Sequence, residues 1–198
     1  MSPTTPTTTV LVLADRDDVR EVAAWLRAHG HAIEDVDRSH DELACVRVRT
    51  ADDCELAVLG DHVGDVVYVT VVGAPALATA WVSQLAGRFT WVGPTEVLAT
   101  LRDDAGTAAP PATAAPAVWI GALSRLAVLR GELENPAMLA AWTAALAHPV
   151  TAVRRAAIRT CHGTRWPGIR AALEARLAVE PDLQRGLRSL LARLQDLS

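Results

Sequence analysis

The sequence predicts a two-domain protein, with an α/β domain at residues 9–102 followed by an all-α domain at residues 118–198. Before residue 103, short β-branched runs alternate with helical patterns, which is typical of α/β proteins. After residue 117, the apolar residues of every segment recur with helical spacing. Residues 103–117 read DDAGTAAPPATAAPA, which has no apolar periodicity, and we expect them to form a linker.

The α/β domain is predicted to begin with a strand and a helix. Residues 1–8 lack the basic and apolar regions of a signal peptide and are expected to form a disordered tail. Residues 9–13 form a short apolar run, which is typical of a buried strand. The helix that follows has acids in its first turn, ends at Gly30 and has an apolar face formed by Val19, Val22, Ala23 and Leu26. A second strand is expected at residues 32–36.

The rest of this domain predicts a hairpin and two further strand–helix pairs. Residues 45–50 alternate strictly, residues 51–53 suit a turn, and residues 54–60 resume the strand pattern. A buried strand is expected at 65–72, a helix at 76–87, a last strand at 89–92 and a short helix after Pro94. Residues 66–87 carry no charge and are numerous enough to span a bilayer. Gly73-Ala74-Pro75 interrupts them, so a strand followed by a packed helix explains the run better than a membrane span does.

The all-α domain is predicted to contain five short helices, at about 117–130, 136–147, 150–161, 167–178 and 183–196. Prolines lie at or near four of the predicted helix starts, where a missing backbone N–H costs little. These prolines are Pro136, Pro149, Pro167 and Pro181. Short helices with such regular punctuation are typical of a repeat array.

The charged residues divide unevenly between the two halves. The chain has 19 basic residues, all of them arginine, against 23 acids, which gives a net charge of −4. Residues 1–116 carry 8 arginines and 17 acids, whereas residues 117–198 carry 11 arginines and 6 acids. Halves of opposite charge could face each other across a domain interface or bind different partners. The three cysteines form no CxxC motif, which favours a reducing, cytoplasmic environment.

A HEAT-repeat motif is suggested by residues 148–163, HPVTAVRRAAIRTCHG. A turn at His148-Pro149 is followed by Val153-Arg154, the small residues Ala156-Ala157 and the closing position Cys161, and this order resembles the second helix of a HEAT repeat. Residues 138–146 would supply its partner helix, and residues 167–177 and 182–194 would form a second, looser unit. The resemblance implies a stack of antiparallel helices in which Arg154 bonds neighbouring turns. His148 departs from the family pattern, which has an acid in this turn.

The N-terminal half has a fainter resemblance to response-regulator receiver domains. Its opening VLVLADRDDVREVAAWLRAHGH is similar to their first strand and helix, and FTWVGPTEVLATLRD is similar to their last strand, turn and helix. Ala14 replaces one of the paired acids and Gly93 replaces the lysine. Asp61 and Thr70 could imitate the phosphoacceptor and hydroxyl positions, which implies a phosphorylation-incompetent relative. We therefore expect a small mixed sheet with flanking helices, either shortened and flavodoxin-like or ferredoxin-like with an extra strand.

Three clusters could carry chemistry, and each has a simpler structural explanation. Asp15, Asp17 and Asp18 could bind Mg²⁺ but also suit a helix start. His29, His31 and His40 with Cys45 and Cys54 could hold zinc, but their spacing matches no zinc finger. Cys161 and His162 could act as nucleophile and base, but adjacent residues point in different directions. The chain lacks a P-loop and a G-x-S-x-G motif. We therefore expect no catalytic site, metal or cofactor.

Arginines on the C-terminal helices are the strongest sign of a binding surface. Helical spacing places Arg155 and Arg159 on one face and Arg185 and Arg188 on another, and stacking would align them into a basic strip. The candidate binding residues are completed by Arg165, Arg170, Trp142 and Trp166. Exposed tryptophans beside arginines would suit base stacking or a protein interface, whereas buried ones would only fill the core.

These residues predict a non-catalytic adaptor or scaffold that binds a protein partner through its helical stack. One alternative is a nucleic-acid-binding protein that uses the arginine strip, and another is a phosphorylation-incompetent, receiver-like signalling protein. A short solenoid with weak caps could also form a homodimer or dock on its own α/β domain. No membrane partner is expected.

Overall fold

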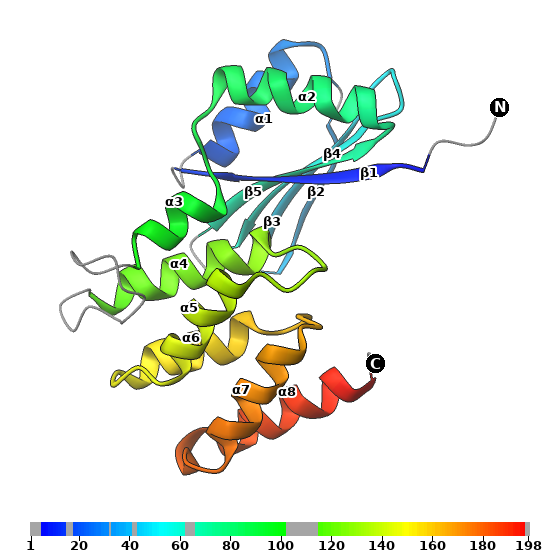
Figure 1. Cartoon of the computed structure of the whole chain (residues 1–198). Coiled ribbons are helices and arrows are strands. Elements are labelled where there is room, and N and C mark those ends of the chain that lie inside the picture. Colours follow the sequence, from blue (N-terminus) through cyan, green and yellow to red (C-terminus); the bar gives the residue numbers. More distant parts are fainter. Residues whose placement is uncertain are drawn as a thin grey trace. The chain divides into compact units, whose positions relative to one another are not determined.

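The computed structural model describes residues 5–14, 18–31, 33–40, 43–61, 66–101 and 115–196 (Figure 1). The chain divides into two compact units, Met1–Gly93 and Pro94–Ser198. The boundary lies ahead of the predicted linker, most of which lies outside the described residues. The short helix after Gly93 belongs to the second unit because it contacts two helices of that unit.

The described residues of the first unit form a six-stranded sheet and two helices. In chain order, these elements are β1 (Thr7–Leu13), α1 (Asp18–Ala28), β2 (Ile33–His40), β3 (Leu43–Arg49), β4 (Glu55–Asp61), β5 (Val66–Gly73), α2 (Pro75–Arg88) and β6 (Trp91–Val92). The strand order is β2-β3-β4-β5-β1-β6, and every neighbouring pair is antiparallel. The expected mixed sheet is therefore wrong. The strands β2 to β5 are neighbours in chain order and so form a meander, while the two helical crossovers connect strands that are not neighbours.

The β3–β4 turn confirms the predicted hairpin. Thr50 donates a backbone hydrogen bond to the carbonyl of Cys54 (2.8 Å), and its hydroxyl accepts one from the backbone N–H of Cys54 (3.0 Å). Asp53 has a φ of 64°, a left-handed conformation that aspartate tolerates better than most residues. Arg49 then pairs with Glu55 and Val46 with Val58, so the alternating residues fall on the expected faces.

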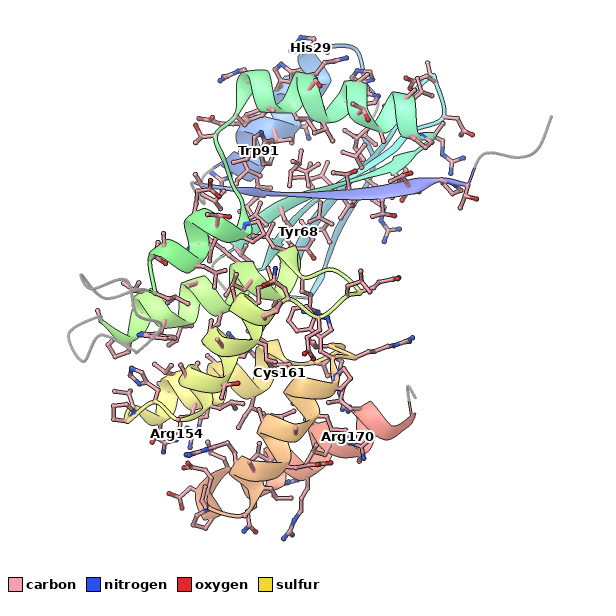
Figure 2. All side chains as sticks on the ribbon, in the orientation of Figure 1. His29, Tyr68, Trp91, Arg154, Cys161 and Arg170 are labelled. Atoms are coloured by element: carbon pink, nitrogen blue, oxygen red, sulfur yellow. The ribbon has the colours of Figure 1, made fainter. Side chains whose placement is uncertain are left out.

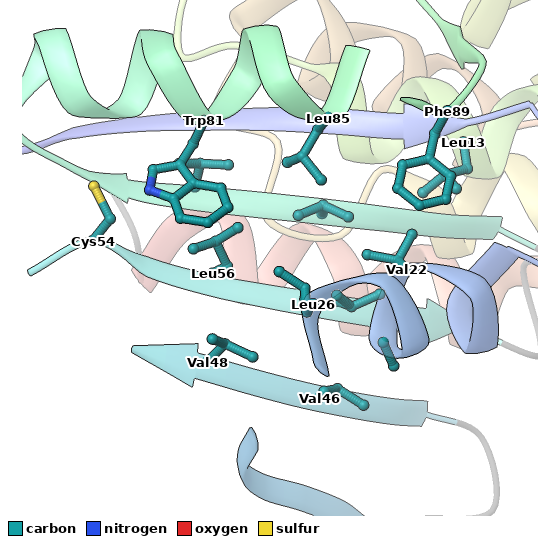
Figure 3. Packing of buried hydrophobic residues seen from close by; sticks show 14 of the residues in the cluster. Leu13, Val22, Leu26, Val46, Val48, Cys54, Leu56, Trp81, Leu85 and Phe89 are labelled. Atoms are coloured by element: carbon teal, nitrogen blue, oxygen red, sulfur yellow. The ribbon is translucent and has the colours of Figure 1, made fainter. Parts of the chain in front are cut away.

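The core of the first unit lies between α1, α2 and one face of the sheet (Figure 3). From α1, Val22 and Leu26 are buried, and from α2, Trp81 and Leu85 are buried. They pack on alternate residues of the strands, which are Leu13, Val46, Val48, Leu56, Val58, Val67, Val69 and Val71. The uncharged run that began at Val66 is thus divided between β5 and α2. Among the described residues, no helix combines the length and apolar character needed to cross a membrane.

The second unit is built from helices in two layers. They are α3 (Pro94–Ala99), α4 (Pro116–Leu129), α5 (Pro136–Leu146), α6 (Thr151–Thr160), α7 (Pro167–Leu177), the 3-10 turn η1 (Pro181–Leu183) and α8 (Gln184–Asp196). The pairs α3–α4, α5–α6 and α7–α8 are in contact. Within one layer α3 contacts α5 and α5 contacts α7, and within the other α4 contacts α6 and α6 contacts α8. The five predicted helices are confirmed as α4 to α8, and α3 completes a third pair.

Candidate binding surface

Arginine is concentrated in one of the two helical layers. The helices α4, α6 and α8 contain Arg125, Arg154, Arg155, Arg159, Arg185, Arg188 and Arg193, and their one acid is Asp196. The helices α3, α5 and α7 contain Arg170 and Arg176 together with Glu96 and Glu174. We call the outward side of α4, α6 and α8 the arginine layer. Its positive charge is therefore not cancelled within the helices that form it.

The helix α6 presents two arginines on the side away from its core. Val153, Ala156, Ala157 and Thr160 are buried on the inner side of this helix. Arg155 and Arg159 are both exposed, and they lie four residues apart on the opposite side. Among the described residues, Arg155 has no hydrogen bond or ion pair. Its guanidinium is therefore available to a ligand without first breaking a contact.

The helix α8, in the next helix pair, also has exposed arginines. Its buried stripe of Leu187, Leu190 and Leu194 leaves Arg185 and Arg188 exposed. Arg188 donates to the side chain of Gln184 (3.2 Å), a neutral partner that leaves its charge uncancelled.

The helices α6 and α8, which carry these two arginine pairs, contact each other. A Cβ on Gly186 would lie 3.9 Å from the side chain of Ile158, so the two helices approach closely. Arg193 and His162 also meet, with Nη1 and Nε2 3.0 Å apart, near the ends of these helices. Arg159 and Arg185 are each next in the chain to a residue of the Ile158–Gly186 approach.

Arg154 lies on the same helix but has an internal role (Figure 2). Its Nη1 donates to the carbonyls of His148 and Pro149, both at 2.8 Å. Its Nη2 donates to the carboxylate of Glu180 at 2.9 Å. This is the bonding between neighbouring turns that was expected at this position. Arg154 therefore anchors the start of α6 to the loop before η1 and is not available for ligands.

Glu180 completes this anchor between two arginines. It is only 8% exposed, and its second oxygen accepts a hydrogen bond from Arg176 at 2.5 Å. Burial raises the pKa of Glu180, but the hydrogen bonds from Arg176 and Arg154 lower it by more, so its pKa is below the ordinary value. The carboxylate is therefore charged at neutral pH and holds α6 and α7 together.

Two further candidate arginines are not part of the arginine layer. Arg165 is exposed in the loop between α6 and α7. Arg170 is on α7, in the other layer, where it forms an ion pair with Glu174 at 3.0 Å (Figure 2). Since that acid is four residues away on the same helix, it offsets much of the local charge.

The tryptophans predicted as binding residues are instead buried in the core. Trp142 is 0% exposed and Trp166 is 2% exposed, with their rings 5.7 Å apart in an edge-to-face arrangement. The indole N–H of Trp142 donates to the hydroxyl of Thr160 (3.0 Å), and that of Trp166 donates to the carbonyl of Gly131 (3.2 Å). A binding role for these residues is corrected to a packing role, because their polar atoms are bonded within the stack.

The adjacent pair Cys161 and His162 does not form a nucleophile and base. Burial raises the pKa of Cys161 to about 12, although the charge of Arg130 opposes the shift. The thiol is therefore protonated at neutral pH, and it lies inside the helical stack (Figure 2). His162 is exposed and its Nε2 contacts Arg193, while its carbonyl accepts from Arg130 at 2.9 Å.

The other predicted clusters are only partly visible. Asp15, Asp17, and the side chains of Asp18, His40 and Cys45 lie outside the described part of the chain. In the part that is described, no group of three metal-ligating side chains comes together. His29 and His31 instead contact aromatic rings, those of Trp25 and Trp81. Burial raises the pKa of the Cys54 thiol, and the negative charges of Asp52 and Asp53 raise it further.

The strand register does not bring Asp61 and Thr70 together. Asp61 pairs with Val66, whereas Thr70 pairs with Ala57. The two residues are thus four positions apart along the β4–β5 pair, about 13 Å at the rise of a strand.

Sequence reasoning missed the contributions of Arg125 and of His148. Arg125 is a half-buried arginine on α4, and its signal was the absence of acids from that helix. His148 is buried against Trp119, and its Nδ1 accepts the backbone N–H of Val150 (3.1 Å) just before α6. An acid in this turn could accept the same bond. Comparisons with protein-family models, with curated proteins and with solved structures give no significant match to the chain.

Proposed function

We propose that the protein is a non-catalytic adaptor whose arginine layer binds an acidic segment of a protein partner. The observation that carries this proposal is the division of charge between the two helical layers: besides the internally bonded Arg154, the helices α4, α6 and α8 carry six arginines and one acid. Guanidinium groups form paired hydrogen bonds with carboxylates, and several on one surface can bind an acidic segment cooperatively.

The helical unit is proposed to be a short HEAT-like array. Its support is the order of contacts, in which consecutive helices pair and alternate helices stack. Arg154 bonding back to the turn before its helix adds to this support. The first unit is proposed to be ferredoxin-like with two additional strands, since each helical crossover joins two strands that run parallel to each other but are not neighbours in the sheet. The buried free thiols of Cys54 and Cys161 support a reducing, cytoplasmic location.

Two observations favour a protein partner over a nucleic acid. Binding of single strands uses exposed aromatic side chains, whereas Trp142 and Trp166 are buried. Residues 1–116 also carry an excess of nine acids, which would repel a polyanion.

The test compares charge reversal in the arginine layer with reversal elsewhere. Arg155, Arg159, Arg185 and Arg188 are changed together to Glu, and the exposed residues Arg20 and Arg27 of α1 are changed to Glu as the control. Binding to a fluorescent glutamate-rich peptide and to DNA oligonucleotides is measured by anisotropy over a salt series. We expect the peptide to bind wild type and the control, and binding to fall at least tenfold in the quadruple variant.

Two results would contradict the proposal. Unchanged peptide binding by a folded quadruple variant would remove the arginine layer as the site. Tighter binding of DNA than of the peptide, with a steep loss on adding salt, would instead favour the nucleic-acid alternative. Purification of the tagged protein from its native lysate, with and without nuclease, would then identify the partner.

A further inference from the structure

The sheet of the first unit has one edge that is left open over five residues. On its inner side, β1 pairs with β5 from Thr7 to Val12 without a register shift. On its outer side, the two-residue strand β6 pairs only with Val12 and Leu13. Among the described residues, no strand pairs with the outer side of residues 7–11. Pro6 precedes this window and β6 ends it.

Strand alternation identifies which backbone groups face this open edge. The N–H of Ala14 donates to the carbonyl of Thr90 at 3.0 Å, on the β6 side. Since alternate residues of a strand direct their N–H and C=O groups to opposite sides, Thr8 and Val10 also direct theirs outward. Thr9 and Leu11 direct theirs toward β5. Two donors and two acceptors are therefore available within the window.

The opposite edge of the sheet has the protection that β1 lacks. The strand β2 includes Glu34, Asp35, Asp37 and Arg38 among its eight residues, and its pairing with β3 has two register shifts. Charges and bulges are the usual means by which proteins prevent edge-to-edge pairing. Residues 7–13 read TTTVLVL, with no charge, and their β-branched side chains favour extended structure. The contrast indicates that the β1 edge is built to be paired.

We propose that two copies of the chain pair through this edge, antiparallel about a two-fold axis at Thr9. Thr8 of each copy then exchanges two hydrogen bonds with Val10 of the other, and Thr9 faces its own equivalent. This register uses the whole window, because Thr7 pairs with Leu11 and each β6 lies just past the end of the other copy's strand. The result is a continuous sheet of twelve strands.

The helix beside this edge is compatible with a second copy. The helix α2 contacts β1 and β5, so it is the helix of the first unit nearest to the window. It has no charged residue before Arg88, and its exposed residues include Ala76, Thr79, Ala80 and Ser83. Two such helices can approach each other without bringing like charges together. The uncharged stretch from Val66 to Gly87 includes most of α2. Close approach of two α2 helices would explain why this part of the stretch carries no charge.

The first test measures the mass of the full chain by light scattering over a concentration series. Wild type is expected at twice 21.1 kDa. Thr8→Pro removes an outward N–H without removing a bond to β5, so we expect a folded monomer at 21.1 kDa. The matched variant Thr8→Val keeps the N–H and is expected to remain a dimer. A wild-type monomer at every concentration, or a dimer of folded Thr8→Pro, would overturn the proposal.

A second variant tests the register even where Thr8→Pro fails to fold. Non-hydrogen-bonded pairs have Cα atoms about 4.5 Å apart, which lies within the range for a disulfide. Thr9→Cys is therefore expected to give a disulfide-linked dimer on mild oxidation, seen on a non-reducing gel. Ala51→Cys, at the exposed β3–β4 turn, is the control and is expected to remain uncrosslinked. A Thr9→Cys protein that crosslinks no more than this control would contradict the two-fold register.

Discussion

At the residue scale, the helical unit is held together by polar side chains that bond across its turns. Arg154 and Arg176 share the carboxylate of Glu180, so that one buried charge is met by two opposite charges. Removing a single member of such a group leaves its partners without compensation, which is more costly than the loss of one surface ion pair. Glu180 is 26 residues from Arg154 in the sequence, and no local pattern predicts that they meet.

The lowered pKa of Glu180 gives a pH dependence with a definite sign. Its carboxylate stabilises the fold above the pKa of an unfolded glutamate, about 4.5, and this contribution is lost as the pH falls through the lower pKa of the folded state. Glu180→Gln should therefore be less stable than wild type at pH 7, and the difference should narrow below about pH 4.5. Urea unfolding of both proteins between pH 7 and pH 3 measures this. A difference that stays constant over the whole range would show that the charge of Glu180 does not contribute.

The buried thiol of Cys161 should be nearly unreactive in the folded protein. With a pKa of about 12 it has very little thiolate at pH 8, whereas an ordinary cysteine has a pKa near 8.5. We expect alkylation at pH 8 to be slower than in the unfolded chain by on the order of a thousandfold. Timed labelling with iodoacetamide, followed by peptide mass spectrometry, measures the rate at this residue. Equal rates in native and denaturing buffer would mean that the thiol is accessible.

At the element scale, helix starts in the second unit differ in how they are capped. Proline begins α4, α5 and α7, but α5 also has a side-chain cap. The side chain of Asn135 accepts hydrogen bonds from Ala137 at 3.0 Å and Met138 at 3.1 Å. This helix is central to its layer, since it contacts both α3 and α7. Weakening the start of α5 should therefore lower the stability of the whole stack of helices.

Asn135→Ala should lower the free energy of unfolding by about 1 kcal/mol, because two N–H groups lose their acceptor. Asn135→Asp keeps an acceptor oxygen and should cost much less. Thr143→Ala provides a control on the same helix, since its hydroxyl bonds only the carbonyl of Leu139 in the preceding turn. Chemical denaturation of the three variants measures the change in the free energy of unfolding that each substitution causes. A loss in Thr143→Ala as large as that in Asn135→Ala would indicate a general effect of shortening side chains on α5.

The elements themselves were largely predictable from local patterns, but their partners were not. Strict alternation at residues 45–50 and the acids at 52–53 identified the β3–β4 hairpin. Of the four prolines expected at or near helix starts, Pro136 and Pro167 begin α5 and α7. The direction of β1 relative to β5 depends on contacts some 60 residues apart, so the expected mixed sheet was wrong. Similarly, α3 pairs with helices on the far side of residues 103–117, which local sequence could not show.

The candidate surface was predictable only where helical spacing determines exposure. Arg155 and Arg159 follow directly from the period of α6, as do Arg185 and Arg188 from that of α8. Spacing alone could not decide whether Trp142 and Trp166 were exposed, because their burial depends on the neighbouring helix and loop. Their hydrogen bonds to Thr160 and Gly131 show that the neighbouring helix and loop supply that environment.

At the scale of the whole molecule, charge is separated rather than mixed. The net charge of −4 and the pI of about 5.8 describe an acidic protein, yet α4, α6 and α8 together carry seven arginines and one acid. A uniform distribution would make the protein behave as a simple anion. When the charges are separated, surfaces of opposite charge can bind different ligands. Each surface acts independently because its electric field is screened within about 8–10 Å at physiological salt.

The protein should therefore bind to ion exchangers of either charge. At pH 7 and low salt, we expect wild type to bind both an anion exchanger and a cation exchanger despite its negative net charge. Changing Arg155, Arg159, Arg185 and Arg188 to Glu should abolish retention on the cation exchanger, because it removes most of the exposed arginine layer. Changing Arg20 and Arg27 to Glu makes the protein more acidic but leaves that layer intact, so retention should persist. Failure of wild type to bind the cation exchanger, or equal losses in both variants, would show that net charge rather than its distribution determines how this protein meets a charged surface.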